Sequence, residues 1–385
     1  MKKLIIICVA LAGSLMPVRA QEVLPDIQRE KDRSRLIPIS IAGYSNDVES
    51  ILKFDLEIAG FSLSLGDKAA FALESTGVGG VEGRLTERST KAVLFANAYN
   101  GGTRRTQAHA LADDVVKAVL HTPGIARTKI AFKVDTGSNS EIYVSDYDGF
   151  GATAITADHA IVAAPAWAPG RKSIYYTSYK SGHPDIYSHD LGSGERRMLA
   201  NYSGLNTSAA VSPDGKRIAM ILSRSGSPDL YVCNSDGSGL KQLTETREDE
   251  SSPCWSSDGT KICVVSRLNE RRGLYIVPSN GGSMTRLRTE GVVNPSEPDW
   301  SPDGKTIVFT AQMGGFSICT VPASGGVATV ITEGEDPSWA PNSRTVVFAR
   351  RVKHSRVLSL LDVPTKQVKD VAHNLGSCSQ PCWAR

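Results

Sequence analysis

Apolar and polar residues alternate in many short segments of the second part of the chain. In the segment KTIVF, for example, Ile307 and Phe309 fall on one face of an extended strand. The segment follows the turn sequence Ser-Pro-Asp-Gly, in which proline presets the φ angle, aspartate bonds the backbone and glycine accepts a positive φ. A Pro-x-Trp stretch precedes the turn. Together these positions predict a β-hairpin that starts just before Trp300.

This hairpin recurs with a nearly constant period. Its tryptophan, replaced once by valine, marks six copies at Trp167, Val211, Trp255, Trp300, Trp339 and Trp383. The intervals are 44, 44, 45, 39 and 44 residues, and a period of this length built of short strands is typical of propeller blades. A third strand, a Gly-containing turn and a fourth short strand complete most units. We therefore predict a six-bladed β-propeller over residues 126–385, with each Trp packed between neighbouring blades.

The sixth blade is divided between the two ends of this region. Only Ala384 and Arg385 follow Trp383, whereas three strand-like segments from Lys129 onward precede the first full repeat. We expect the strand around Trp383 to complete the sheet that begins at Lys129. This arrangement would close the ring and remove one pair of open sheet edges.

Residues 36–124 have a different pattern and predict a small α/β domain. A strand starts at Leu36, and a helix with Asp47 as a plausible cap runs until Gly60. Two further strands lie in EGRLTE and KAVLFANAY, and a second helix runs from about Gln107 to Pro123.

The N-terminus has the three-part pattern of a cleaved secretory signal. Lys2 and Lys3 precede an apolar stretch, and small residues lead to an expected cleavage after Ala20. The apolar stretch is about half of the roughly 20 residues that a spanning helix needs. Residues 21–35 are charged and without pattern, so we expect a flexible arm. No later segment is apolar enough to span a membrane, and we expect a soluble, exported monomer.

Charge and motifs argue against nucleic-acid binding and catalysis. Lys and Arg number 43 and Asp and Glu 40, so the net charge is +3 and no basic stripe is expected. The chain has no Gly-x-Ser-x-Gly, no His-Glu-x-x-His and no Gly-rich phosphate loop. The nearest approach to a metal cluster, from His183 to Asp190, is interpreted as solvated surface, and the repeated Asp-Gly aspartates as turn formers. We predict no enzyme activity, no metal and no cofactor.

Six cysteines follow the predicted signal, and an exported protein can oxidise them. Cys254 and Cys263 flank one Ser-Asp-Gly turn and are expected nearly opposite each other on adjacent strands. Disulfide pairing and burial of free thiols in a β core both remain open from the sequence.

The repeat, joined to two other stretches, resembles the TolB family, the soluble periplasmic component of the Tol-Pal envelope system. RTKIAFKV followed by EIYVSDYDGFG, residues 127–151, is similar to the family's entry into its propeller. ILKFDLEIAGF, residues 51–61, resembles the helix of the family's N-terminal domain. The likeness covers nearly all of the chain after the predicted signal.

The resemblance implies a scaffold without enzyme activity that supports outer-membrane integrity and cell division. Its propeller would bind a Pal-like peptidoglycan-associated lipoprotein through the loops before Pro-x-Trp, and its arm and N-terminal domain would engage a TolA-like inner-membrane protein. The partner-binding residues that this implies are Asn206, Ser251, Ser252, Ser296, Glu297 and Glu335 on the propeller, and Glu22 and Val23 on the arm. Two positions depart from the family pattern: Leu205 replaces a histidine and Ser252 a glutamate.

Two other functions fit a propeller of this kind. A peptidoglycan- or carbohydrate-binding propeller would present exposed aromatic platforms. A degenerate peptidase- or lactonase-type propeller would need a hydrolase domain or a ring of metal ligands in its channel, and the chain has no room for the former.

Overall fold

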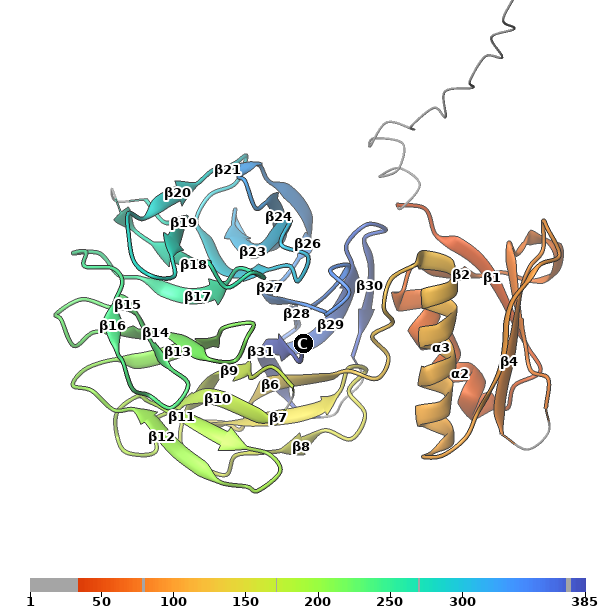
Figure 1. The fold of residues 1–385 in the computed structure, drawn as a ribbon, viewed down its shortest axis with the longest axis horizontal. Helices are drawn as coiled ribbons and strands as arrows, with labels where there is room; N and C mark the ends of the chain where they lie inside the picture. The colour runs from red at the N-terminus through yellow and green to blue at the C-terminus, as the bar shows by residue number, and fades with distance from the viewer. Residues whose placement is uncertain (1–33, 78–79, 171, 269–270, 372–374) are drawn as a thin grey trace, which may run out of the picture.

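A computed structural model describes residues 34–77, 80–170, 172–268, 271–371 and 375–385. The predicted signal sequence and nearly all of the predicted arm, with Glu22 and Val23, lie outside these residues. Figure 1 shows a ring of sheets with a smaller α/β unit beside it. Within the described ranges, no helix combines the length and the apolar character that a membrane crossing requires.

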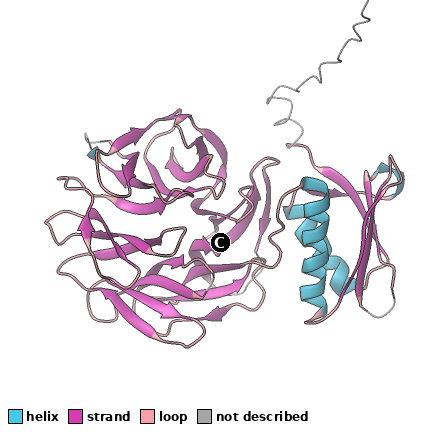
Figure 2. Cartoon of the chain, in the orientation of Figure 1, coloured by secondary structure: helices cyan, strands magenta, loops and turns pink. Residues whose placement is uncertain are grey.

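The ring is a six-bladed propeller, as the repeat predicted, and each blade is a four-stranded antiparallel sheet (Figure 2). We number the blades I to VI in the chain order of their innermost strands. The strands, from innermost to outermost, are β9 (Val162–Trp167), β10 (Ser173–Ser178), β11 (Asp185–Asp190) and β12 (Arg196–Ala200) in blade I; β13 (Asn206–Val211), β14 (Arg217–Leu222), β15 (Asp229–Asn234) and β16 (Lys241–Gln242) in blade II; and β17 (Ser251–Trp255), β18 (Lys261–Ser266), β19 (Gly273–Pro278) and β20 (Thr285–Leu287) in blade III.

The second half of the ring has the same order, with one small addition. Its strands are β22 (Pro295–Trp300), β23 (Thr306–Gln312), β24 (Phe316–Pro322) and β26 (Thr329–Glu333) in blade IV; β27 (Glu335–Trp339), β28 (Thr345–Val352), β29 (Ser355–Asp362) and β30 (Gln367–Asp370) in blade V; and β31 (Ser377–Trp383), β6 (Lys129–Asp135), β7 (Ser140–Asp146) and β8 (Thr153–Ala154) in blade VI. The short strands β21 (Thr289–Glu290) and β25 (Gly326–Val327) pair in parallel beside blades III and IV.

Blade VI is built from both ends of the propeller sequence. The last strand, β31, pairs antiparallel with β6, so that Trp383 lies opposite Ile130 and Cys382 opposite Ala131. The Trp383 indole is buried, and its Nε1 donates a hydrogen bond of 2.8 Å to Thr128 Oγ1. Beyond it, Arg385 donates to the carbonyl oxygens of Trp300 and Trp339 in blades IV and V. The chain end therefore ties three blades together.

The Asp-Gly positions of the repeat are turn formers, as predicted. In the blade IV turn, Asp303 Oδ1 accepts hydrogen bonds from the Ser301 hydroxyl at 2.6 Å and from the Lys305 N–H at 3.1 Å. Gly304 has a φ of 75°, which closes the hairpin. Because these carboxylate oxygens are used within their own turns, they do not form a ligand ring.

The tryptophans pack between blades. Trp300 is 5% exposed and lies in one cluster with Cys254, Val265 and Leu274 of blade III and with Phe309 of blade IV. The two cysteines of blade III, Cys254 and Cys263, lie in direct register on β17 and β18 and are free thiols. The inter-blade layers are therefore apolar, and the cysteines belong to them.

The N-terminal domain is a five-stranded sheet covered by two helices. The strand order is β2 (Phe61–Leu63), β1 (Ile37–Ala42), β3 (Phe71–Glu74), β4 (Val81–Glu87) and β5 (Val93–Tyr99). The helices are α2 (Asn46–Ile58) and α3 (Arg104–Leu120), and a 3-10 turn, η1 (Gly66–Lys68), precedes β3. The pattern analysis missed β2 and β3, because three or four residues are too few to show alternation.

Both helices begin earlier than the pattern indicated. The N-cap of α2 is Ser45, and Asp47 lies in the first turn. For α3 the cap is Thr103, whose hydroxyl accepts from the Thr106 N–H while the Thr106 hydroxyl accepts from the Thr103 N–H. This reciprocal cap starts the helix at Arg104 instead of about Gln107.

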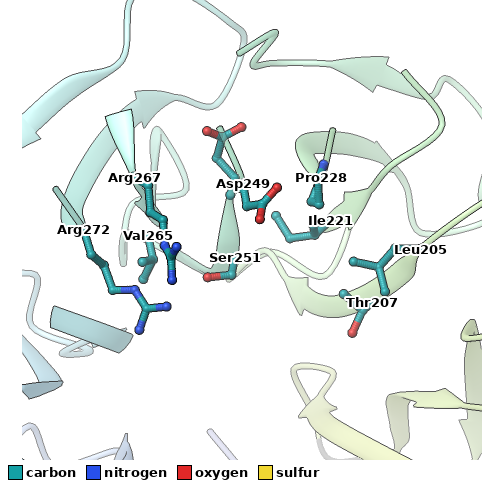
Figure 3. A pocket seen from close by; sticks show the side chains of 10 residues that line it. Leu205, Thr207, Ile221, Pro228, Asp249, Ser251, Val265, Arg267 and Arg272 are labelled. Carbon is teal, nitrogen blue, oxygen red and sulfur yellow. The ribbon is translucent and has the colours of Figure 1, made fainter. Parts of the chain in front are cut away.

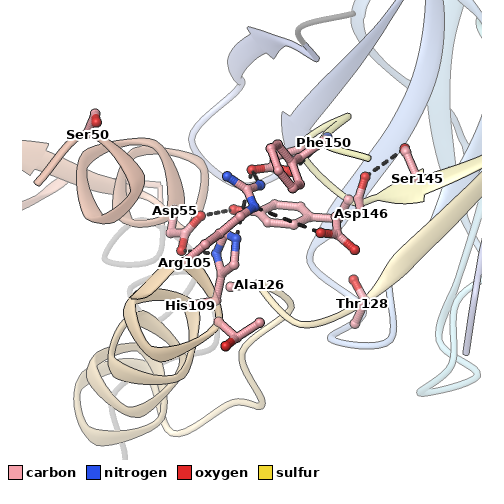
Figure 4. Close-up of polar contacts among 12 residues, drawn as sticks. Ser50, Asp55, Arg105, His109, Ala126, Thr128, Ser145, Asp146 and Phe150 are labelled. Atoms are coloured by element: carbon pink, nitrogen blue, oxygen red, sulfur yellow. Dashed lines mark hydrogen bonds and ion pairs between the residues drawn. The ribbon is translucent and has the colours of Figure 1, made fainter. Parts of the chain in front are cut away.

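The two helices lie between their own sheet and the propeller, and a buried carboxylate joins the two parts (Figures 1 and 4). Asp55 of α2 accepts a hydrogen bond from the Tyr147 hydroxyl, and its other oxygen lies 2.7 Å from Nδ1 of His109 on α3. Arg105, one turn earlier on α3, pairs with Asp148. Tyr147 and Asp148 belong to the Ser-Asp-Tyr-Asp-Gly turn at the end of β7, which thus supplies one of the propeller's contacts with the helices; another is the ion pair between Lys369 of β30 and Glu57 of α2.

The inter-blade position of Trp300 predicts a large loss of stability on truncation. Trp300→Ala should lower the free energy of unfolding by about 3 to 5 kcal/mol, because a large side chain leaves a cavity in a packed layer. Urea denaturation of the parent, this variant and Trp300→Phe provides the measurement. If thermal melting of the same proteins places Trp300→Ala within a degree or two of the parent, the interior placement is contradicted.

The domain contact generates a second prediction. Tyr147→Phe keeps the ring, which packs against Phe54 and Trp383, but removes the donor to the buried Asp55 carboxylate. We expect a loss of about 1.5 to 3 kcal/mol, the range for hydrogen bonds to charged groups. The matched control is Tyr143→Phe, because Tyr143 stacks on Phe132 within blade VI. Equal urea midpoints for the two variants would refute the role of this bond.

Candidate functional site

One residue in each innermost strand has a left-handed backbone, and these six residues surround the propeller axis. Each lies three positions before the Trp mark and coincides with a shift in strand register. We call this set the bulge ring; its members, with φ between 49° and 57°, are Ala164, Ser208, Ser252, Glu297, Asp336 and Gln380.

The sequence explains why a bulge forms there. In five of the six strands the next residue is proline, as in Glu297-Pro298 and Asp336-Pro337. Proline has no N–H to give to a ladder, so it is tolerated in sheets only at edges and irregularities. The Pro of Pro-x-Trp therefore marks the point where the innermost strand leaves its partner.

At three of the six blade junctions, a side chain of the bulge ring reaches from one blade to the next. Glu297 Oε2 accepts from the backbone N–H of Asp336 at 3.0 Å, and Asp336 Oδ2 accepts from that of Gln380 at 2.9 Å. Gln380 Oε1 then accepts from the N–H of Ala164 at 2.9 Å. These three bonds link blades IV, V, VI and I in sequence, and we call them the relay.

The relay stops at Ala164. The side chains of Ala164, Ser208 and Ser252 are short, and no side chain of the described residues accepts from the backbone N–H of Ser208, Ser252 or Glu297. The junctions between blades I and II, II and III, and III and IV thus lack the bond that closes the other three.

A cavity of about 320 Å³ occupies one of these open junctions (Figure 3). It lies between blades II and III, at the end of the propeller where the innermost strands begin. Its lining combines apolar, hydroxyl and charged side chains: Leu205, Thr207, Ile221, Pro228, Asp249, Glu250, Ser251, Val265, Arg267 and Arg272.

The structure places the predicted propeller residues at this same end, in different environments. Asn206 has no exposed surface: its amide donates to the carbonyls of Pro184, Tyr202 and Gly204 and accepts from the Tyr202 N–H, so it shapes the loop that precedes β13. Ser251 is exposed and lines the cavity, while Ser252 belongs to the bulge ring.

The two predicted glutamates both have partners within the propeller. Glu297 is half-buried and also accepts from the Thr310 hydroxyl at 2.6 Å. Glu335 is buried and pairs with Arg356 and Arg351 of blade V. Ser296 is half-buried beside Glu297. Partner binding by these six residues stays a prediction.

Two residues that the sequence analysis did not single out have central places in this site. The position equivalent to Glu297 in the next blade is Asp336, not its neighbour Glu335, and in blade VI it is Gln380. The signal was present, because each immediately precedes the proline of the repeat.

The environment of Asp336 perturbs its ionisation. Burial raises the pKa of Asp336 to about 7, and the negative charge of Glu297 adds to this effect. The hydrogen bond from the Gln380 N–H and the charge of Arg356 act in the opposite direction but do not offset it. A carboxyl group that changes charge near neutral pH therefore lies at the centre of the relay.

The remaining polar clusters do not form a metal centre. In the described part of the chain, no group of three or more His, Cys, Asp and Glu side chains is arranged to hold a metal ion. Asp185 and His189 are buried, so their prediction as solvated surface was wrong; the strand β11 carries both inside the sheet.

Comparison with known proteins identifies the family. The profile described as the TolB beta propeller domain matches residues 116–385, about two thirds of the chain. The chain belongs to the TolB β-propeller domain family. The repeat and the shared last blade on which the sequence resemblance rested lie within the matched residues.

Curated relatives of this family match the chain over shorter stretches. The Tol-Pal system protein TolB of Azoarcus sp. strain BH72 is 33% identical over 123 residues, which are 32% of this chain and 29% of that protein. The Tol-Pal system protein TolB of Aromatoleum aromaticum is 29% identical over 206 residues, 44% of this chain and 48% of that protein. The chain thus spans less than half of the length of these relatives.

Solved structures extend the likeness to the N-terminal domain. The crystal structure of TolB from Acinetobacter baumannii superposes with a TM-score of 0.82 at 22% identity, covering 91% of this chain and 97% of that one. At this identity the match shows the fold: a six-bladed propeller with a small α/β domain before it.

The raised pKa of Asp336 predicts a pH-dependent stability. An unfolded aspartate ionises near pH 3.9, so between about pH 4 and 7 the folded chain holds a proton that the unfolded chain has released. Stability should therefore fall as pH rises through this window. Asp336→Asn keeps an oxygen for the Gln380 N–H and removes the charge, so its melting temperature should exceed that of the parent at pH 8 and approach it at pH 4.5. An equal difference at both pH values would contradict this assignment.

Proposed function

We propose that the chain is a periplasmic scaffold of a Tol-Pal system, without enzyme activity, that docks a Pal-like lipoprotein on the bulge-ring end of its propeller. The observation that carries the proposal is the bulge ring itself, which gathers the predicted residues Ser252 and Glu297 around one end of a closed ring. The names of the curated relatives, Tol-Pal system protein TolB, support the same system.

The physical character of this end supports docking of a protein. The relay holds the backbone of blades IV, V, VI and I, so a partner meets a preorganised surface there and little conformational freedom is lost on binding. The end also combines a cavity with exposed charged side chains around it, as interfaces with a buried centre and polar rim do.

The N-terminal domain has a separate place in the proposal. We propose that the arm, with Glu22 and Val23, and the α/β domain engage a TolA-like inner-membrane protein, and that the chain works in outer-membrane integrity and cell division. Secretion through the N-terminal signal, with cleavage after Ala20, would bring it to the periplasm.

A carbohydrate-binding propeller is less well supported. Among the described residues, the exposed large aromatic side chains are Phe150 and Tyr179. The guanidinium of Arg105 lies 4.1 Å from the Phe150 ring centre at the domain contact. Tyr179 on its own is too small a surface for a sugar platform.

Binding to the soluble domain of the Pal-like lipoprotein encoded in the same genome tests the proposal. The mature chain should bind it in calorimetry. Glu297→Ala should weaken binding by about tenfold, because it removes the carboxylate that accepts from both the Thr310 hydroxyl and the Asp336 N–H and leaves this N–H with the Thr310 hydroxyl oxygen at 3.2 Å. The control is Glu333→Ala, an exposed glutamate on the outermost strand of the same blade. A folded parent that does not bind refutes the proposal.

A further inference from the structure

We propose that the cavity between blades II and III receives an acidic side chain from a protein partner, which completes the relay at this junction. The proposal rests on the proposed function only in taking the bulge-ring end as the docking face. It predicts that an acidic side chain occupies the junction of blades II and III, by analogy with the three relay bonds.

The relay shows what the open junction lacks. At three junctions a carboxylate or amide oxygen from one blade accepts the bulge N–H of the next blade, at 2.9 to 3.0 Å. Ser252 has the same backbone conformation, with φ 52° against 56° for Asp336, and the same register shift. Its N–H therefore points toward blade II, where Ser208 offers no side chain long enough to reach it.

The cavity lies directly beside the two bulge-ring residues of this junction. Thr207, next to Ser208, lines it from blade II, and Ser251, next to Ser252, lines it from blade III. The junctions of the relay are filled by glutamate, aspartate and glutamine side chains of the chain itself. Here the corresponding volume of about 320 Å³ is empty of protein atoms.

Charge at the cavity favours an acid over a neutral side chain. Arg267 and Arg272 lie on one side of the cavity, facing Leu205 and Thr207 in Figure 3, and neither forms an ion pair with another described residue. Of the two acidic lining residues, Glu250 is buried and accepts from the hydroxyls of Thr244, Thr246 and Ser266. Its carboxylate is therefore used within the blade. Asp249, the other acidic lining residue, is exposed and forms no ion pair with a described residue, so one free carboxylate stands against two guanidinium groups at the cavity.

The apolar part of the lining suits the stem of a glutamate. Leu205, Ile221 and Val265 would contact its methylene groups, and its carboxylate would accept from the Ser252 N–H beside the two guanidinium groups. A partner glutamate would thus accept from the Ser252 N–H as Glu297 accepts from the Asp336 N–H.

The relay also supplies a variant that fills the cavity from within. In Ser208→Glu the new side chain stands one blade before Ser252, as Glu297 stands one blade before Asp336. It should accept the Ser252 N–H and compete with the partner. Ala164→Glu is the matched control: it adds the same charge to the same ring, but at the junction of blades I and II, away from the cavity.

The test uses the mature chain with ¹⁵N-labelled serine and the peptides acetyl-Gly-Glu-Gly-amide and acetyl-Gly-Gln-Gly-amide. The Glu peptide should shift the Ser252 amide signal, and the Gln peptide should not. Ser208→Glu and the double variant Arg267→Ala/Arg272→Ala should each lower the affinity for the Glu peptide by about fivefold or more. The affinity of Ala164→Glu should stay within about twofold of that of the parent. Equal shifts by both peptides, or equal weakening by Ser208→Glu and Ala164→Glu, would overturn the proposal.

Two further arms separate this proposal from its alternatives. A muropeptide that shifts the Ser252 signal at lower concentration than the Glu peptide would overturn the choice of a protein as the source of the carboxylate. If the Pal-like lipoprotein does not bind but the peptide result is as expected, the proposed function fails and the acidic site stands. If the lipoprotein binds equally to the parent and to Ser208→Glu, the site fails and the function stands.

Discussion

Closure of the ring by β31 and β6 is the constraint on which the rest of the molecule depends. A sheet left without its innermost strand would expose unpaired backbone groups at the axis, where five other blades converge. Pairing of the last strand with the first propeller strand removes that edge and fixes the spacing of all six innermost strands. The relay depends on this spacing, because the side chains of Glu297, Asp336 and Gln380 reach the next blade only when neighbouring strands are held at the right separation. The docking end is therefore a property of the closed ring and of no single blade.

The sequence predicted what local residues determine. Tryptophan spacing, the Pro-Asp-Gly turns and strand alternation gave the number of blades and the shared last blade, because each signal acts over a few residues. The short strands β2 and β3 were missed for the opposite reason: their pairing with β1 is set by tertiary contacts. The burial of Asp185 and His189 was missed too. The cluster from His183 to Asp190 is polar, so its sequence does not indicate which face of the strand packs against the core.

The candidate site was predictable in outline but not in detail. The loops before Pro-x-Trp were found, yet Glu335 was chosen where Asp336 holds the position equivalent to Glu297. Both are acids and adjacent, and the one that faces the next blade is distinguished by its left-handed backbone and, in the sequence, by its place directly before Pro337. The relay joins residues that are 39, 44 and 216 positions apart, so its bonds have no signature within a window of sequence. The open junction of blades II and III reflects the short side chain of Ser208, and a short residue gives no positive signal in the sequence.

The shared carboxylate at the domain contact has a mechanical consequence. Asp55 meets Tyr147, 92 residues away, and His109, 54 residues away, so a slide of the helices along the propeller by one turn would strand a buried charge. A purely apolar interface of the same area would tolerate such a shift. The two domains should therefore move as one rigid body, and a force applied to the N-terminal sheet would rotate the propeller with it.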